Sequence, residues 1–101
     1  MGFKVVLTPQ SIDDLEGIVT FISKDDSDRA RTFGYELIDR ALSLAHFPER
    51  GRVVPEVGDT FTREIVHGAY RIIYEIFPDT GLVFVLRFWH GARGKPETIA
   101  D

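Results

Sequence analysis

The feature that most limits the fold of this chain is a change in the spacing of its apolar residues near position 61. Before that point, apolar side chains recur every three or four residues, which is the period of an amphipathic helix. After it, they alternate with polar ones in places, and β-branched and aromatic residues dominate, which is typical of strands. A chain that changes period in this way is expected to fold as helices packed against a sheet.

Two helices are predicted in the first part of the chain. A short strand over residues 3–7 precedes Thr8, which can cap a helix whose first residue is Pro9. A polar cluster at residues 24–28 ends this helix and offers caps for the next, which ends before Gly51. The two apolar stripes consist of Ile12, Leu15, Ile18, Val19 and Ile22, and of Ala30, Phe33, Leu37, Ile38, Ala41, Leu44 and Ala45.

Three strands are predicted in the second part, over residues 61–66, 69–77 and 82–89. His67-Gly68 and residues 78–81 separate them, and both connections have the length and composition of hairpin loops. The predicted order is therefore βααβββ in a single domain, residues 1–101. This is an α+β fold, in which an antiparallel sheet carries a helical hairpin on one face.

Composition excludes several classes of site. The chain has no cysteine, which removes disulfides, thiolate chemistry and cysteine-bound zinc. The three histidines, His46, His67 and His90, are too widely spaced for a local zinc motif, and no glycine pattern for phosphate or dinucleotide loops occurs. We therefore expect no metal and no cofactor. No apolar run approaches 18 residues and no signal peptide is visible, so no membrane partner and a cytoplasmic location are expected.

Charge argues against a general nucleic-acid surface. The chain has twelve Lys and Arg residues and 16 Asp and Glu residues, which gives a net charge of −4. Nucleic-acid binders usually have a basic face. The net charge does not exclude a local cluster of arginines, which suit bidentate contact with phosphate. The arginines in the second half that could hold phosphates are Arg52, Arg63 and Arg93, while Arg71 lies within a central strand.

The first hairpin loop sets the expected neighbour of Arg71. If Val66 pairs with Ala69 across His67-Gly68, Glu64 lies directly opposite Arg71. A cross-strand ion pair between these two side chains would be a purely structural role for the arginine.

The second hairpin loop sets the expected place of His90. If Phe77 pairs with Leu82, Arg71 faces Phe88, and His90 lies diagonally about 7–8 Å from Arg71 on the same face. A shift of one residue in either loop would put Arg71 and His90 on opposite faces. Both faces carry apolar residues, so the pattern leaves open which one meets the helices. The other face would hold Tyr70, Ile72, Tyr74, Ile76, Val83, Val85, Arg87 and Trp89.

Three residues form the predicted catalytic group: Glu56, Arg71 and His90. A carboxylate, a guanidinium and an imidazole could cleave RNA through attack by the 2′-hydroxyl, because such groups can accept a proton, offset phosphorane charge and protonate the leaving oxygen. The structural alternatives are a solvent-facing loop glutamate, an ion-paired arginine and a strand-end histidine that is a surface or capping group.

The order of elements and several local strings resemble the RelE/ParE superfamily of bacterial type II toxins. The most specific part is a Tyr-Arg-Ile-Ile-Tyr strand followed by a strand that ends in His-Gly-x-Arg. The strings are Asp14-Leu15-Glu16-Gly17-Ile18, His46-Phe47-Pro48-Glu49-Arg50-Gly51-Arg52, Pro55-Glu56, Arg63-Glu64-Ile65, Tyr70-Arg71-Ile72-Ile73-Tyr74-Glu75-Ile76 and His90-Gly91-Ala92-Arg93.

The resemblance implies a toxin neutralised by a cognate antitoxin protein, with a role of the plasmid-stabilisation type. It also implies an assembly that is a homodimer or a heterotetramer with the antitoxin. RelE-like and YoeB-like members are metal-independent endoribonucleases that cleave mRNA on the ribosome, and by position Glu56, Arg71 and His90 resemble the YoeB-like catalytic residues. This mRNA interferase is the first hypothesis.

Two alternatives follow from the same resemblance. ParE-like members are non-enzymatic inhibitors of DNA gyrase, and a degenerate member would bind only its antitoxin. Gly91 stands where the YoeB-like branch has a tyrosine, and the net charge of −4 contrasts with the lysine-rich surfaces of RelE-like toxins. Both departures favour the ParE-like alternative.

Overall fold

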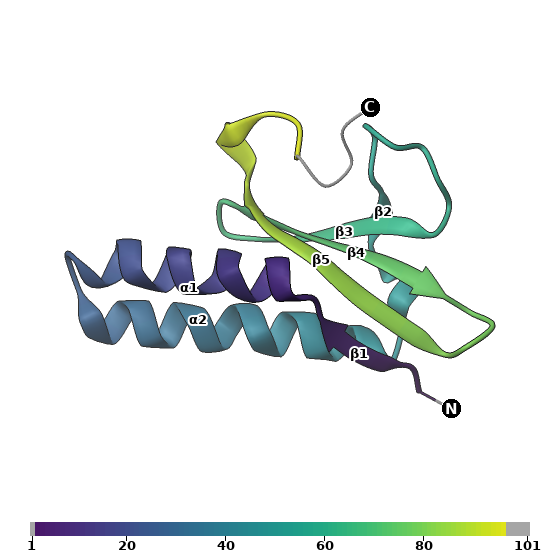
Figure 1. The fold of residues 1–101 in the computed structure, drawn as a ribbon, viewed down its shortest axis with the longest axis horizontal. Coiled ribbons are helices and arrows are strands. Elements are labelled where there is room, and N and C mark those ends of the chain that lie inside the picture. The colour runs from purple at the N-terminus through teal and green to yellow at the C-terminus, as the bar shows by residue number, and fades with distance from the viewer. Residues whose placement is uncertain (1, 97–101) are drawn as a thin grey trace.

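The computed structural model describes residues 2–96 and has two layers, a helical hairpin and a mixed sheet (Figure 1). Strand β1 (Lys4–Leu7) leads into helices α1 (Pro9–Ser23) and α2 (Ser27–Leu42). The short turns η1 (Ser43–Ala45) and η2 (Pro48–Arg50) follow, then strands β2 (Arg52–Val53), β3 (Thr62–His67), β4 (Tyr70–Phe77) and β5 (Leu82–His90), and the final turn η3 (Gly91–Arg93).

The predicted α+β class and the order of the main elements are confirmed, with two additions. The sheet order is β1-β5-β4-β3-β2, and β1 runs parallel to β5 while the other neighbours are antiparallel. The two-residue strand β2 was not predicted, because a segment that short has no detectable period. The second helix ends at Leu42, and the rest of its predicted stripe lies in η1.

Both helices begin where their capping residues predict. The Thr8 side chain accepts a hydrogen bond from the backbone N–H of Ser11 at 3.2 Å, and Pro9 occupies the first turn. Asp26 accepts one from the N–H of Arg29 at 3.0 Å. Each cap satisfies a backbone donor that the helix itself cannot, so the boundaries follow directly from the sequence.

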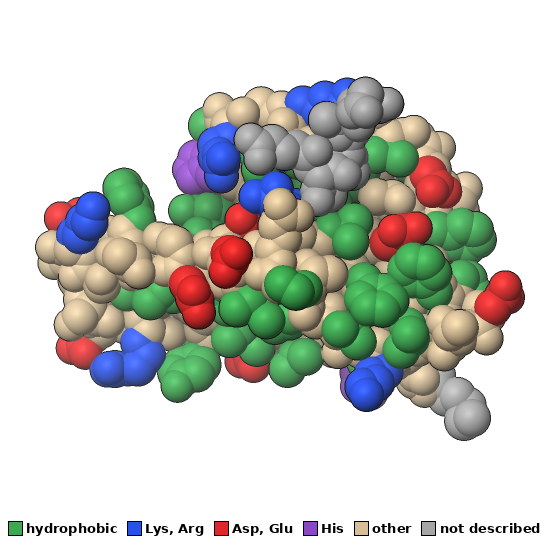
Figure 2. All heavy atoms as spheres, in the orientation of Figure 1, with side chains coloured by type: hydrophobic (Ala, Val, Ile, Leu, Met, Phe, Trp, Pro, Cys, Tyr) green, Lys and Arg blue, Asp and Glu red, His purple; other side chains and the backbone are tan. Residues whose placement is uncertain are grey.

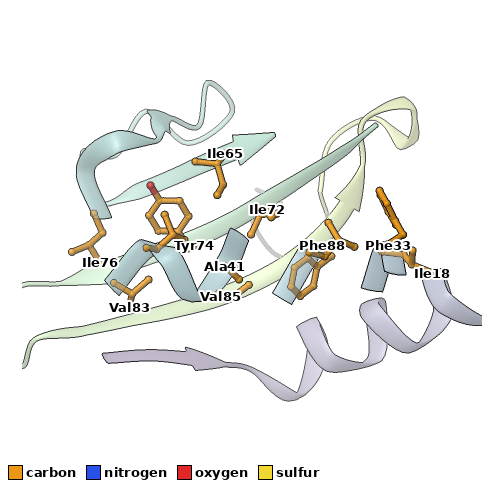
Figure 3. Close-up of a cluster of buried hydrophobic side chains, with 12 residues drawn as sticks. Ile18, Phe33, Ala41, Ile65, Ile72, Tyr74, Ile76, Val83, Val85 and Phe88 are labelled. Carbon is orange, nitrogen blue, oxygen red and sulfur yellow. The ribbon is translucent and has the colours of Figure 1, made fainter. Parts of the chain in front are cut away.

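The main core lies between the hairpin and one face of the sheet (Figure 3). Its buried residues are Ile18, Phe33, Leu37, Ala41, Leu44, Ile65, Ile72, Tyr74, Ile76, Val83, Val85 and Phe88. A smaller cluster of Val54, Ile73 and Trp89, with Leu86 packed against it, forms separately. The pattern had left open which face the helices cover, and it is the face that carries Ile72, Tyr74 and Ile76.

The register between β3 and β4 differs from the prediction by two residues. Val66 pairs with Arg71, not with Ala69, and Glu64 pairs with Ile73. The loop consists of Gly68 and Ala69 because Gly68 adopts a φ of +59°, which a glycine tolerates at the first position of a two-residue hairpin loop. A shift of two residues keeps Arg71 and Glu64 on the same face, so they are diagonal neighbours instead of directly opposed ones.

The register between β4 and β5 was predicted correctly only at the loop. Phe77 pairs with Leu82 and Tyr74 with Val85, but Ile73 pairs with Arg87, so Leu86 is an extra residue in β5. This β-bulge shifts all later pairs by one: Arg71 faces Trp89, and His90 faces Tyr70. The predicted placement of Arg71 and His90 on one face was therefore wrong.

Asp14 attaches helix α1 to the edge of β5. Strand β1 covers only the first part of that edge, so the N–H of Phe88 lies beyond it and donates to the Asp14 carboxylate at 3.1 Å. The guanidinium of Arg87 donates to both carboxylate oxygens at 2.7 and 2.8 Å. Both side chains are largely buried, so this ion pair is a structural joint.

Within residues 2–96, no helix is long and apolar enough to span a membrane.

Replacing Asp14 should destabilise the fold strongly. Asp14→Ala removes three hydrogen bonds and leaves the Arg87 charge largely buried without its carboxylate, which is expected to cost about 3 kcal/mol of unfolding free energy. Urea denaturation measures the loss. Asp13→Ala, at the exposed neighbouring position, is the matched control and should change stability by less than about 0.5 kcal/mol. Equal effects of the two variants would contradict the role given to Asp14.

Candidate functional site

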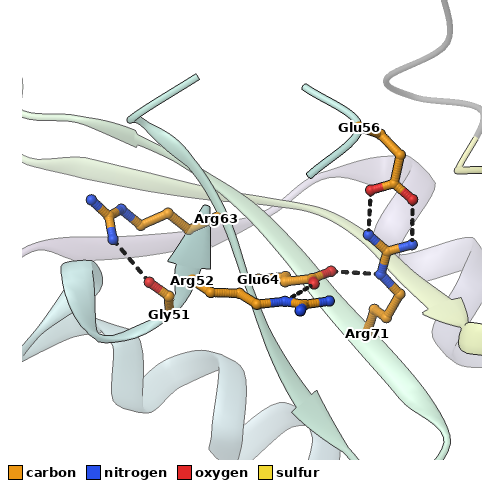
Figure 4. A network of polar contacts seen from close by, with 6 residues as sticks. All are labelled: Gly51, Arg52, Glu56, Arg63, Glu64 and Arg71. Atoms are coloured by element: carbon orange, nitrogen blue, oxygen red, sulfur yellow. Dashed lines mark hydrogen bonds and ion pairs between the residues drawn. The ribbon is translucent and has the colours of Figure 1, made fainter. Parts of the chain in front are cut away.

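A polar network occupies the sheet face opposite the helices, where β3 and β4 lie side by side (Figure 4). Glu64 is at its centre, and its side chain is 0% exposed. One Glu64 oxygen accepts from Nε of Arg71 and the other from Nε of Arg52, both at 2.5 Å. The buried carboxylate is thus compensated by two guanidinium groups, as burial of a charge requires.

Glu56 completes the network from the loop that follows β2. Its two carboxylate oxygens accept hydrogen bonds from the two terminal nitrogens of Arg71, at 2.8 and 3.0 Å. Residues 55–61 of this loop are all exposed, and the bidentate pair ties the loop to β4. Nε and both terminal nitrogens of Arg71 are therefore bonded to carboxylates, and its side chain is only 12% exposed.

The network also shifts the pKa values of Glu56 and Arg71. Hydrogen bonds from Arg71 lower the pKa of Glu56, against a smaller opposing effect of burial. The pKa of Arg71 is raised, mainly by its hydrogen bonds to Glu56 and further by Glu64. A carboxylate with a lowered pKa is a weaker base, so this arrangement favours a permanent ion pair over proton transfer.

His90 lies on the other side of the sheet from Arg71. Its ring packs edge-on against Tyr70, with centroids 5.0 Å apart, and its Nδ1 accepts a hydrogen bond from the N–H of Ala92 at 3.0 Å. His90 therefore caps η3, which was the structural alternative considered for it. Of the three predicted catalytic residues, the structure brings Glu56 and Arg71 together and separates His90 from them.

The three predicted phosphate-binding arginines lie in different surroundings. Arg52 pairs with Glu64. Arg63 donates to the carbonyl oxygens of Gly51, Glu49 and Thr60, and so holds η2 and the loop before β3. Arg93 lies with its guanidinium carbon 4.0 Å from the centroid of the Trp89 ring. They do not form one cationic cluster.

A second site, which sequence reasoning missed, is an open pocket of about 450 Å³ beside the end of β5. It is lined by Asp13, Asp14, Gly17, Ile18, Phe21, Tyr70, Phe88, His90 and Arg93. The bulge in β5 brings His90 to Tyr70, and the packing of α1 supplies the opposite wall. Because neither is visible in local periodicity, the only available signal was the nearness of His90 to Arg93 in the chain.

Among residues 2–96, no group of three His, Asp or Glu side chains is placed to hold a metal ion.

Residues 5–94 match the family described as ParE toxin of type II toxin-antitoxin system, parDE. The chain belongs to this family. The sequence has no significant match among curated proteins. The family match confirms the resemblance to the RelE/ParE superfamily. This ParE-family toxin is also similar in fold to solved toxin–antitoxin structures.

The first is the RelBE2 toxin–antitoxin complex from Mycobacterium tuberculosis, with a TM-score of 0.69 and 21% identity over 89% of this chain and 99% of the other. The second is a chromosomal ParDE toxin–antitoxin system from P. aeruginosa, with a TM-score of 0.70 and 12% identity over 87% of this chain and 95% of the other. At these identities the two structures establish the shared fold.

The pair between Glu56 and Arg71 should make stability depend on pH in the acid range. Because the folded-state pKa of Glu56 lies below its ordinary value of 4.5, its stabilisation is complete above that value and is lost as pH falls through the lowered pKa. We expect Glu56→Gln to reduce stability by about 1 kcal/mol at neutral pH.

Thermal denaturation of both proteins between pH 7 and pH 3 tests this expectation. The difference in melting temperature between wild type and Glu56→Gln should shrink steadily as the pH falls below about 4.5. A difference that is absent at pH 7, or that grows on acidification, would contradict the bidentate pair.

Proposed function

We propose that this ParE-family toxin acts by binding a protein target, DNA gyrase, and does not cleave RNA. The observation that carries the proposal is the state of Arg71, whose nitrogens are bonded to Glu56 and Glu64. An arginine that stabilises a phosphorane must offer its N–H groups to phosphate oxygens. Here a phosphate would have to displace a bidentate carboxylate first.

The positions of the other two groups support the same conclusion. Cleavage by the 2′-hydroxyl requires a base and an acid within hydrogen-bond reach of one phosphodiester. Both oxygens of Glu56 accept hydrogen bonds from Arg71, its pKa is lowered, and His90 lies across the sheet. A ribonuclease reading would require the bulge in β5 to rearrange.

Charge supports a protein target over a polyanion. The net charge of −4 opposes binding of RNA or of the ribosome, whose phosphates favour basic partners. Inhibition of gyrase through a protein–protein interface has no such requirement.

We also propose that a cognate antitoxin protein binds this chain, as the two similar structures are toxin–antitoxin complexes. Several large apolar side chains remain exposed among the described residues and offer contact area for such a partner. They include Phe21, Tyr35, Phe47, Phe61, Val66 and Phe77.

Two parallel assays with the purified protein test the gyrase proposal. The first measures supercoiling of relaxed plasmid by DNA gyrase, and the second measures the integrity of mRNA in a reconstituted translation reaction. We expect loss of supercoiling with intact message. Truncated message, or no effect in either assay, would contradict the proposal, the latter result favouring a member that only binds its antitoxin.

The variants Glu56→Gln and Arg71→Lys sharpen the comparison. Arg71→Lys keeps a cation beside the buried Glu64 carboxylate, so the fold should survive. Because neither residue performs chemistry in this proposal, both variants should inhibit gyrase within about twofold of wild type. Message truncation that these substitutions abolish would support the ribonuclease hypothesis instead.

A further inference from the structure

The pocket beside the end of β5 lies where the helical hairpin extends past the sheet. Figure 2 shows an indentation there, with a histidine and a basic side chain on the sheet side and a hydrophobic side chain on the hairpin side. Its volume of about 450 Å³ lies within the range typical of small-ligand and side-chain pockets. No group of the polar network around Arg71 lines it.

One wall of the pocket carries a cation that is held in place. The Arg93 guanidinium lies over the Trp89 ring, with a distance of 4.0 Å from its central carbon to the ring centroid, and Trp89 Nε1 donates to the Gly94 carbonyl at 3.0 Å. These contacts order η3 and its arginine. Arg93 is exposed and, within residues 2–96, forms no ion pair with a carboxylate. An ordered cation that none of the described carboxylates pairs with is suited to bind an anionic group.

His90 adds a second donor to the same wall. Its Nδ1 accepts the N–H of Ala92, so the proton of the neutral ring is on Nε2. The edge-on contact with Tyr70 fixes the orientation of the ring. The wall therefore combines a permanent positive charge with an imidazole N–H. Both groups are hydrogen-bond donors suited to an anionic acceptor.

The floor of the pocket and the part of the helix wall at Gly17 and Phe21 are apolar. Ile18 and Phe88 are buried beneath the pocket, and Tyr70 and the exposed Phe21 border it. Gly17 leaves the wall open, since a Cβ built there would meet no atom within 4 Å. The space is suited to a flat or branched apolar side chain.

The acidic rim decides what kind of anion fits. Asp14 is bonded to Arg87, but Asp13, which also lines the pocket, forms no ion pair within the described residues. A carboxylate carries one negative charge, whereas a phosphate carries up to two and a nucleic acid brings more. With Asp13 nearby and a net charge of −4, the single charge is favoured.

We propose that this pocket binds a segment of a protein partner in which an acidic residue stands next to an aromatic one. The carboxylate binds Arg93 and the His90 N–H, and the ring packs against Tyr70, Phe88 and Phe21. The inference rests on the proposed function only in taking a protein, and not RNA, as the partner.

A titration with short blocked peptides tests the assignment directly. The isotope-labelled full chain is titrated with N-acetyl-Phe-Glu-amide, N-acetyl-Phe-Gln-amide and uridine 5′-monophosphate, and backbone amide shifts are followed by NMR. The Glu peptide should shift the amides of Gly17, Phe21 and Arg93 saturably. The Gln peptide should bind about fivefold more weakly, as expected for loss of one partly exposed charge pair.

Three variants locate the binding. Arg93→Gln should lower the affinity for the Glu peptide to that for the Gln peptide. Gly17→Phe should abolish binding of both peptides by filling the pocket. Gly17→Ala is the matched control, which should bind normally because its Cβ meets open space. The Arg93→Gln variant loses the contact with Trp89. If that loss unfolds the protein, Gly17→Phe, which leaves this contact in place, still tests the pocket.

Three results would overturn the inference: no saturable shifts at the pocket, equal binding of the two peptides, or tighter binding of the nucleotide. The supercoiling assay is separate. Peptide binding without gyrase inhibition would therefore refute the proposed target and leave the pocket assignment intact. Gyrase inhibition without peptide binding would refute the pocket assignment and leave the proposed target intact.

Discussion

The arrangement of this toxin depends on one extra residue in β5. Leu86 has no partner in β4, and the bulge it creates inverts the facing of every later residue in that strand. Phe88 then faces the helices and joins the main core, while Trp89 packs with Ile73 and Val54 on the other side. Without the bulge, Trp89 would face the helices and Phe88 would lie beside Arg71. The assignments of Phe88 to the main core, of Trp89 to the smaller one and of His90 to the side away from Arg71 are consequences of that single insertion.

The bulge also explains why the fold was easier to predict than the site. Caps at Thr8 and Asp26 and the apolar stripes act locally, so helix boundaries and strand order can be inferred from neighbouring residues. A bulge is not encoded in this way. The run from Leu82 to His90 is almost entirely apolar, so it has no strict alternation that would reveal a change of face. The pairing at the loop was correct, but it could not be extended past Leu86.

The Arg71 network shows a different limit. Diagonal contact between Arg71 and Glu64 was foreseeable because a register error of two residues preserves the face. The bidentate contact from Glu56 was not, since it depends on how an exposed loop folds back over the sheet. The family resemblance grouped Glu56, Arg71 and His90 by position along the chain, and the predicted register put Arg71 and His90 on one face. Their chemistry depends on position in space, and there the first two neutralise each other while the third caps a turn.

The sheet thus separates two environments with different uses for arginine. On one face, Arg71 forms an ion pair with Glu64, whose burial without a guanidinium would strongly destabilise the fold. Beyond the end of β5, Arg93 is ordered by an aromatic ring, which fixes the side chain but does not cancel its charge. An ion pair occupies the N–H donors of a guanidinium and offsets its charge, whereas stacking on an indole leaves the donors and the charge available to a partner. Binding of an acidic partner is therefore expected at the stacked arginine, and the paired one serves the fold.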